Sequence, residues 1–259
     1  MRQGPESRQP RRPLPDAVVT SARRLRSEDV QIETLFLDAG GVLVFPNWDR
    51  VAATLSRHGI RVSGDALRQV EPAAKFAVDD AQRVASSSDA DRGSAYLESV
   101  LGNAGVTPSP GRDAALDELY TYHSEHNLWE HVPADVKPAL ERLAALGLRL
   151  AIASNANGIL QRMFDRVGLT PYFHAICDSC VEGVEKPDRR FFDIVLQRSG
   201  GTAATTLHVG DLYHVDVVGA RRAGLQAMLI DPHDLYSGYD VERVRSLSEL
   251  ADRIEQGRA

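Results

Sequence analysis

The 259-residue sequence lacks long apolar runs and an excess of positive charge. None of its apolar runs approaches the roughly 20 residues that a membrane-spanning helix needs. The N-terminal residues are basic, but their longest apolar run, at 17–19, is too short for a signal peptide. The formal net charge is −6, whereas nucleic-acid binders carry a basic field. These absences predict a cytoplasmic protein that binds neither nucleic acid nor membranes.

Cysteine and lysine are also scarce. Cys177 and Cys180 form a C-x-x-C pair, a spacing found in redox motifs and in one half of many zinc sites. A zinc site needs two more ligands at similar spacing, and no such pair stands nearby, so we expect two reduced cysteines in a strand and the loop after it. Of the 30 basic residues only three are lysines, so each lysine draws more interest than usual. They are Lys75, Lys137 and Lys186.

The pattern of apolar residues divides the chain into three parts. Residues 1–30 hold four prolines and seven arginines without apolar periodicity, which predicts a disordered basic arm. Residues 31–46 and 134–259 alternate short apolar strands with helices, which is typical of a doubly wound parallel sheet. Residues 47–133 favour amphipathic helices, with no convincing strand. We therefore expect an α/β core interrupted after its first strand by an all-helical insertion.

The expected elements are as follows. The insertion should hold helices at 48–58, 65–84, 94–104 and 113–128. The core should hold strands at 34–38, 148–153, 174–177, 206–210 and 226–230. Its helices should lie at 134–146, 158–167, 188–198, 215–223 and 246–255.

Polar residues that follow the predicted strands are the candidates for chemistry, because open parallel sheets bind ligands at the carboxyl ends of their strands. In the segment LFLDAGGVLV, residues 35–44, an apolar strand delivers one carboxylate to a turn of two glycines. The same rule selects a Ser-Asn pair, a lysine and two further aspartates. The candidates are Asp38, Gly40, Gly41, Ser154, Asn155, Lys186, Asp211 and Asp216.

Together these residues describe a phosphoryl-transfer site. Clustered carboxylates repel one another and need a cation, and their oxygen ligands suit Mg²⁺. Such an ion screens a phosphate from a carboxylate nucleophile. Lys186 would neutralise charge on the nucleophile and on the phosphoryl group. Ser154, Asn155 and the N–H groups of the glycine turn would bind phosphoryl oxygens.

Four segments, DAGGV, SN, KP and GDLYHVD, resemble in order and spacing the motifs of the haloacid dehalogenase-like (HAD) hydrolase superfamily. The resemblance covers most of residues 34–230 and implies a Rossmann-like core with a helical cap. It also implies a Mg²⁺ cofactor and a small phosphorylated metabolite as substrate. The roles it implies are Asp38 as nucleophile, Ser154, Asn155 and Lys186 at the phosphoryl group, and Asp211 and Asp216 with Asp38 and the Gly40 carbonyl at the metal.

Gly40 departs from the family pattern. Phosphatases of the family usually carry a second aspartate at this position, which protonates the leaving group and later activates water. General acid–base assistance is typically worth about 10²- to 10⁴-fold in rate. We therefore expect a slow phosphatase that favours good leaving groups.

Several alternatives remain open on the sequence. A 2-haloacid dehalogenase needs no leaving-group acid, but the pair Asp211 and Asp216 argues for a metal. A weakly active phosphate-binding or regulatory protein would keep the site and hardly turn over. His214 could supply the missing acid, although a surface loop histidine is the simpler interpretation. We expect three histidines, His123, His126 and His131, at the solvated end of the last insertion helix, and no Schiff-base role for Lys75. The substrate and the oligomeric state stay open.

Overall fold

The computed structural model describes residues 31–258, and the basic arm expected over residues 1–30 lies outside them. Six parallel strands form the central sheet in the order β5-β4-β1-β6-β7-β8. They are β1 (Thr34–Leu37), β4 (Arg149–Ser154), β5 (Ala175–Asp178), β6 (Thr206–Gly210), β7 (Gln226–Ile230) and β8 (Glu242–Val244). The predicted α/β class with a doubly wound parallel sheet is confirmed.

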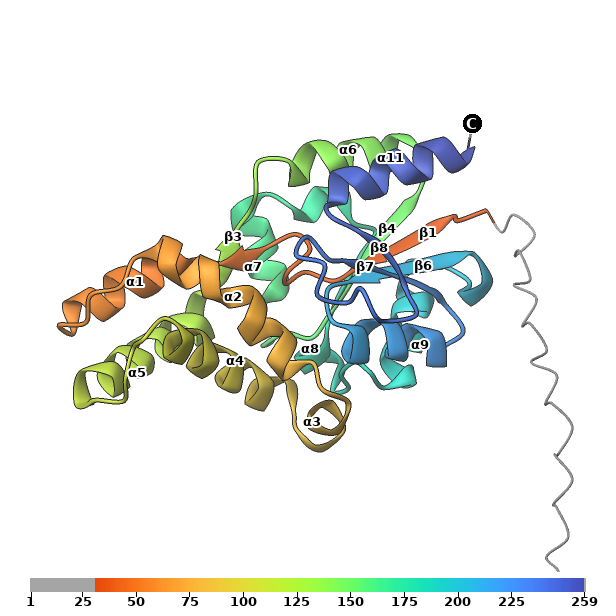
Figure 1. Cartoon of the computed structure of the whole chain (residues 1–259). Helices are drawn as coiled ribbons and strands as arrows, with labels where there is room; N and C mark the ends of the chain where they lie inside the picture. The colour runs from red at the N-terminus through yellow and green to blue at the C-terminus, as the bar shows by residue number, and fades with distance from the viewer. Residues whose placement is uncertain (1–30, 259) are drawn as a thin grey trace, which may run out of the picture. The chain divides into compact units, whose positions relative to one another are not determined.

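Helices cover both faces of the sheet. They are α6 (Val136–Ala145), α7 (Leu160–Val167), α8 (Ser179–Glu182), α9 (Arg189–Ser199), α10 (Val218–Arg222) and α11 (Leu247–Arg258). Leu35 and Leu37 of β1 pack into a buried cluster with α6, α7 and α11, whereas Phe36 packs into a second cluster with α9 and α10. Figure 1 shows α6 and α11 on one side of the sheet and α9 on the other. Because successive side chains of a strand point to opposite faces, a strand buried on both faces is a continuous apolar run.

A helical insertion follows the first strand. It comprises α1 (Trp48–Arg57), α2 (Gly64–Val78), α3 (Ala81–Ser86), α4 (Asp89–Asn103) and α5 (Pro110–His126). Its buried residues, among them Val51, Leu67 and Val100, form a cluster separate from those of the sheet. The two connections to the core pair as a short antiparallel ribbon of β2 (Phe45–Pro46) and β3 (Trp129–His131).

Some elements differ from the expected ones. The helix expected at 65–84 is interrupted, because the Asp80 side chain accepts hydrogen bonds from the N–H groups of Gln82 and Arg83 and starts α3 there. The strands β2, β3 and β8 were not expected, since two or three residues are too few to show a period. The helix expected at 215–223 opens with a π-helical turn at Tyr213–Val217 before α10.

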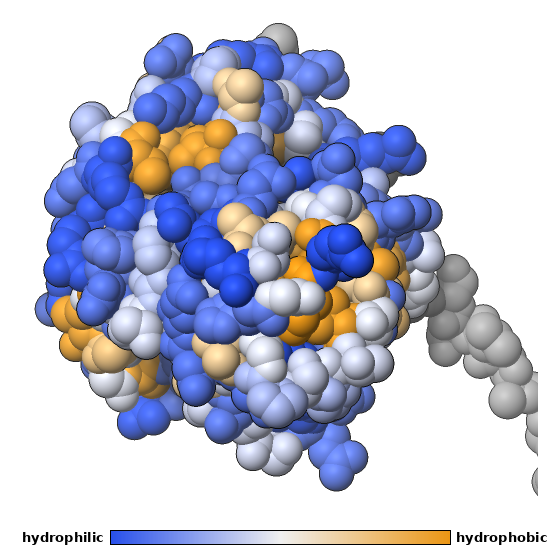
Figure 2. Space-filling model, turned by 90° about the vertical axis from the view of Figure 1, so that its left-hand side faces the viewer, coloured by the Kyte–Doolittle hydropathy of each residue, from blue (hydrophilic) through white to orange (hydrophobic). Residues whose placement is uncertain are grey.

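The surface is mostly hydrophilic with separate hydrophobic patches on the face that carries α1 and α5 (Figure 2). Within residues 31–258, none of the helices has both the length and the apolar character that a bilayer span requires. Cys177 is buried in β5 and Cys180 is exposed in α8, and both thiols are free.

Candidate active site

Three neighbouring strands bring polar side chains to one edge of the sheet. Asp38 directly follows β1, Asp211 directly follows β6, and Ser154 is the last residue of β4. Because β1 pairs with both β4 and β6 in parallel register, the ends of these strands lie side by side. The convergence expected from the sequence therefore arises from the strand order itself.

Three carboxylates meet at this edge. One oxygen from each of Asp38, Asp211 and Asp216 lies within 4.8 Å of the other two, and all three residues are buried. Asp216 reaches the cluster from the π-helical turn, where its Oδ2 accepts hydrogen bonds from the N–H groups of Asp211 (3.2 Å) and Leu212 (3.0 Å). Several carboxylate oxygens at such separations are a ligand set that suits a divalent cation such as Mg²⁺.

Lys186 lies inside the cluster and is fully buried. Its Nζ is 3.1 Å from Asp38 Oδ1 and 2.7 Å from Asp216 Oδ1. Burial opposes the charge on this ammonium group, but Asp216 and Asp38 outweigh it and raise the pKa of Lys186 above its ordinary value. The lysine therefore stays protonated and shares its single positive charge between two of the carboxylates.

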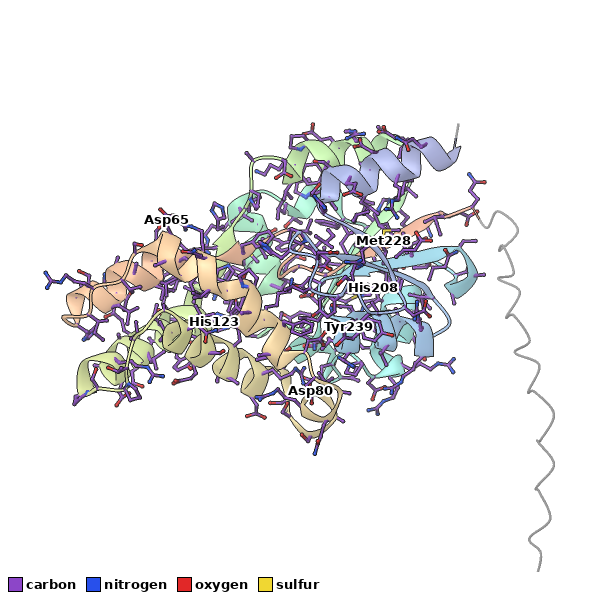
Figure 3. All side chains as sticks on the ribbon, in the orientation of Figure 1. Asp65, Asp80, His123, His208, Met228 and Tyr239 are labelled. Carbon is purple, nitrogen blue, oxygen red and sulfur yellow. The ribbon has the colours of Figure 1, made fainter. Side chains whose placement is uncertain are left out.

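His208 supports the same carboxylate from β6. Its Nε2 lies 3.0 Å from Asp216 Oδ1, and both residues are completely buried. Figure 3 labels His208 within the core. Burial would raise the pKa of Asp216, but Lys186 and His208 hold that pKa well below its ordinary value. Asp216 is therefore a permanent anion that fixes the position of Lys186.

Asp38 is less strongly stabilised as an anion than Asp216. Burial raises the pKa of Asp38 to about 6, while Lys186 and the Ser154 hydroxyl act in the opposite direction. Its Oδ1 accepts a hydrogen bond of 2.7 Å from the N–H of Ala39, which directs the carboxylate. A divalent cation would add the positive charge that keeps Asp38 ionised near neutral pH.

Asn155 and Gly41 are engaged within the protein rather than open to a ligand. The Asn155 amide accepts the N–H of Lys186 (2.8 Å) and donates to the Lys186 carbonyl (3.0 Å), so it positions the lysine backbone. The N–H of Gly41 donates to the Val44 carbonyl at 3.0 Å within the turn. Direct binding of phosphoryl oxygens by these two groups therefore stays a prediction.

The two glycines of the turn meet different surroundings. Gly41 has a φ of +71°, and a Cβ atom there would collide with the Asp211 carboxylate, so this position requires glycine. Gly40 is not in the left-handed region, and a Cβ there would face Trp129. The backbone thus tolerates a side chain at position 40, although none is present.

A cavity of about 780 Å³ lies over the carboxylates. Its walls come from the sheet edge and from the helical insertion, which contributes apolar and aromatic side chains together with Lys75 and Arg92. The expected site residues border it: Asp38, Gly40, Gly41, Ser154, Asn155, Lys186 and Asp211. Asp216 lies beneath them, with no exposed surface.

Two cavity residues of the insertion were not expected at the site. Lys75 Nζ lies 2.9 Å from Asp211 Oδ2. His123, which Figure 3 labels among the insertion helices, was expected at a solvated helix end but lines the cavity, where its Nδ1 accepts the Leu128 N–H at 3.1 Å. Burial lowers the pKa of His123, so its ring is neutral at neutral pH.

His214 contacts Asp79 at the end of α2. Its Nδ1 lies 2.8 Å from the backbone carbonyl of Asp79, and it is not among the described residues that line the cavity. The structure therefore gives no support to His214 as a substitute for the missing acid.

Two contacts fasten the insertion to the core beside the site. The buried Asp79 carboxylate, at the end of α2, accepts the N–H groups of Tyr213 (2.6 Å) and His214 (3.0 Å) and the Tyr236 hydroxyl (2.8 Å). At the start of α4, the Asp89 N–H lies 3.1 Å from Glu185 Oε1, next to Lys186. The core loops next to Lys186 and after Asp211 thus contact the insertion.

The sequence matches a known protein family and several characterised relatives. A family model described as haloacid dehalogenase-like hydrolase matches residues 32–224. The chain is 35% identical over 142 residues to ribulose-1,5-bisphosphate 5-phosphatase of Halopiger xanaduensis, covering 54% of this chain and 58% of that protein. It is 32% identical over 127 residues to haloacid dehalogenase-like hydrolase domain-containing protein 3 of Mus musculus, covering 49% and 50%. The matched region thus spans little more than half of these relatives.

A solved structure extends the likeness across most of the chain. The HAD-hydrolase YfnB from Bacillus subtilis, solved bound to magnesium, matches with a TM-score of 0.63 and 19% sequence identity. The match covers 86% of this chain and 99% of that chain. At this level of identity the likeness is one of fold.

Proposed function

The chain belongs to the haloacid dehalogenase-like hydrolases, and on this premise we propose that it is a Mg²⁺-dependent phosphatase of a small phosphorylated metabolite. The observation that carries the proposal is the buried ammonium of Lys186 between Asp38 and Asp216, within a cluster of three carboxylates. The relative that is 35% identical over 142 residues is a ribulose-1,5-bisphosphate 5-phosphatase, which supports attack on a phosphoryl group over displacement of a halide.

In this proposal Mg²⁺ is held by Asp38, Asp211, Asp216 and the Gly40 carbonyl. The three carboxylates fit such an ion, because they bring oxygen ligands within 4.8 Å of one another and carry more charge than Lys186 neutralises. When bound, Mg²⁺ screens the phosphoryl charge from the nucleophile. Lys186 holds the Asp38 carboxylate in place, and Asn155 holds Lys186 through its backbone.

The proposed reaction has two steps. An Asp38 carboxylate oxygen forms a bond to phosphorus while the ester bond to the leaving oxygen breaks, which yields an aspartyl-phosphate and an alcohol. Water then attacks the phosphoryl group, which releases phosphate and restores the Asp38 carboxylate. Because Gly40 offers no acid, the leaving oxygen takes its proton from solvent. Substrates with good leaving groups should therefore react fastest.

The helical insertion would act as the cap in this proposal. We assign residues 47–133 to the cap and residues 31–46 and 134–259 to the core. Insertion residues form one wall of the cavity between the two parts, and core residues form the other. The Asp79 contacts join the insertion to the core. A cytoplasmic location, expected from the sequence, belongs to the same proposal.

The test compares wild type with Asp38→Asn on para-nitrophenyl phosphate and acetyl phosphate, with Mg²⁺ and with EDTA. We expect EDTA to abolish turnover and Asp38→Asn to lower it by on the order of 10³-fold or more, because the nucleophile is lost. Asp113→Asn, an exposed acid of α5, serves as the control and should keep wild-type rates. Equal rates for wild type and Asp38→Asn would rule this mechanism out.

Gly40 also favours a second candidate, a 2-haloacid dehalogenase. There Asp38 would attack carbon and expel halide, a leaving group that needs no acid. Asp216 would still position Lys186 there, but a cluster of three buried carboxylates that suits a cation has no evident task in that reaction, which places it second. Halide release from 2-haloacids in the presence of EDTA would reverse this order.

A further inference from the structure

Lys75 is the cation that the helical insertion brings to the carboxylate cluster. Its Nζ lies 2.9 Å from Asp211 Oδ2, and its side chain is only 14% exposed. Glu71, one turn earlier on α2, lines the same cavity and accepts the Tyr96 hydroxyl at 2.9 Å. This face of α2 therefore borders the cavity, and Lys75 connects it to the core loop that begins at Asp211.

Two lysines balance the cluster from opposite sides. Lys186 contacts Asp38 and Asp216 from the core, whereas Lys75 contacts Asp211 from the insertion. Burial opposes the charge on Lys75, but Asp211 outweighs it and raises the pKa of Lys75. Lys75 thus places a positive charge beside Asp211, which is also one of the candidate metal ligands.

A divalent cation and this ammonium group compete for Asp211. An ion bound by the three carboxylates would lie within a few ångströms of Nζ, and like charges at that distance repel strongly in a buried site. Lys75 has another place to go, because it lines the cavity into which a phosphoryl group would enter. Its ammonium is a point charge on a flexible four-carbon stem and is able to change partners while α2 stays in place.

We propose that Lys75 exchanges partners: it holds Asp211 in the metal-free protein, and it binds an oxygen of the substrate's phosphoryl group once Mg²⁺ takes Asp211. The inference rests on the proposed function for the metal and the substrate class. Three carboxylates, two ammonium groups and one divalent cation carry a net charge of +1, which suits a phosphate dianion. Lys75 is then the residue by which the insertion senses both ion and substrate.

The first test titrates Mg²⁺ into the full chain without substrate and follows binding by calorimetry. Lys75→Met should bind Mg²⁺ at least about fivefold more tightly than wild type, the lower end of typical coupling between sites, because its competitor is gone. Lys75→Gln should behave in the same way and guards against a folding defect of one variant. Lys137→Met, on α6, is the control and should match wild type. Unchanged or weaker Mg²⁺ binding in both Lys75 variants would overturn the exchange.

The second test measures the binding of inorganic phosphate at saturating Mg²⁺. Lys75→Met should bind phosphate at least about fivefold more weakly, whereas Lys75→Arg should retain most of the affinity. Equal phosphate affinity in wild type and Lys75→Met would overturn the contact with substrate. The results separate failure of the partner exchange from failure of the proposed function. Mg²⁺ binding to Lys75→Met but not to wild type would support the competition. No Mg²⁺ binding to either protein would overturn both proposals.

Discussion

A Cβ atom added to Gly40 would lie 3.4 Å from Cδ1 and 3.5 Å from Nε1 of Trp129. These are ordinary van der Waals distances, and the backbone of Gly40 is outside the left-handed region. The indole therefore covers the position at which phosphatases of the family usually carry an acid, without closing it to a side chain. Trp129, the first residue of β3, therefore shapes the space next to Asp38.

Gly40→Asp should raise the Mg²⁺-dependent rate on alkyl phosphates by about tenfold or more, because general acid–base assistance is typically worth about 10²- to 10⁴-fold. The gain should be smaller on para-nitrophenyl phosphate, whose leaving group needs less help. Gly40→Ala adds the Cβ without the carboxylate and should leave the rate unchanged. A Gly40→Asp protein no faster than Gly40→Ala would show that the missing acid does not limit turnover, and a weakly active regulatory role would lose its main support.

Lys186→Met should destabilise the metal-free protein by about 3–5 kcal/mol, because it leaves the buried Asp38 and Asp216 carboxylates without their cation. Thermal unfolding followed by circular dichroism measures the change. Mg²⁺ should restore more stability to this variant than to wild type, since the ion replaces part of the lost charge. Lys137→Met, outside the cluster, should change stability by no more than about 0.5 kcal/mol. A small loss for Lys186→Met would mean that the carboxylates protonate at little cost.

Asp79→Asn should destabilise the protein by about 1–3 kcal/mol, because an amide replaces one of two acceptor oxygens that receive N–H and O–H donors. The adjacent Asp80→Asn is the matched control. Asp80 caps α3 on the surface, and asparagine is an equally good N-cap, so stability should hardly change. Equal denaturant midpoints for the two variants would contradict the importance of the Asp79 contacts.

The acidic limb of the activity profile should depend on Mg²⁺. Asp38 attacks only as a carboxylate, and burial raises its pKa to about 6 in the metal-free protein, so activity is lost as pH falls through that value. A bound cation favours the carboxylate and lowers its pKa. The limb of kcat/KM for para-nitrophenyl phosphate should therefore move to lower pH as the Mg²⁺ concentration rises. A limb that stays in place would show that another group controls it.

The sheet was predictable because its strands are buried on both faces and bounded by turns. The limits expected for the strand at 206–210 are those observed. The rule that ligands bind at the carboxyl ends of parallel strands predicted Asp38 and Asp211 at one edge of the sheet. Asp216 was also placed in the cluster, although the π-helical turn that carries it has no recognisable period.

The contribution of the insertion was not predictable from the sequence. Lys75 and His123 lie on helices whose periodicity describes their own packing, and nothing in that pattern tells which exposed face meets the core. The scarcity of lysine was the one sign that pointed to Lys75. Asn155 was expected at the phosphoryl group, but its amide satisfies the backbone of Lys186, a pairing between residues 31 positions apart.

The ribbon of β2 and β3 has a mechanical consequence. Both connections between the insertion and the core pass through it side by side, so a rotation of the insertion has a single pivot. Trp129 belongs to this pivot, and Gly40 lies only a few residues before its first strand. A rotation of the insertion that admits substrate would also move the Trp129 indole relative to Asp38. Substrate entry and the shape of the cavity beside the nucleophile would therefore change together.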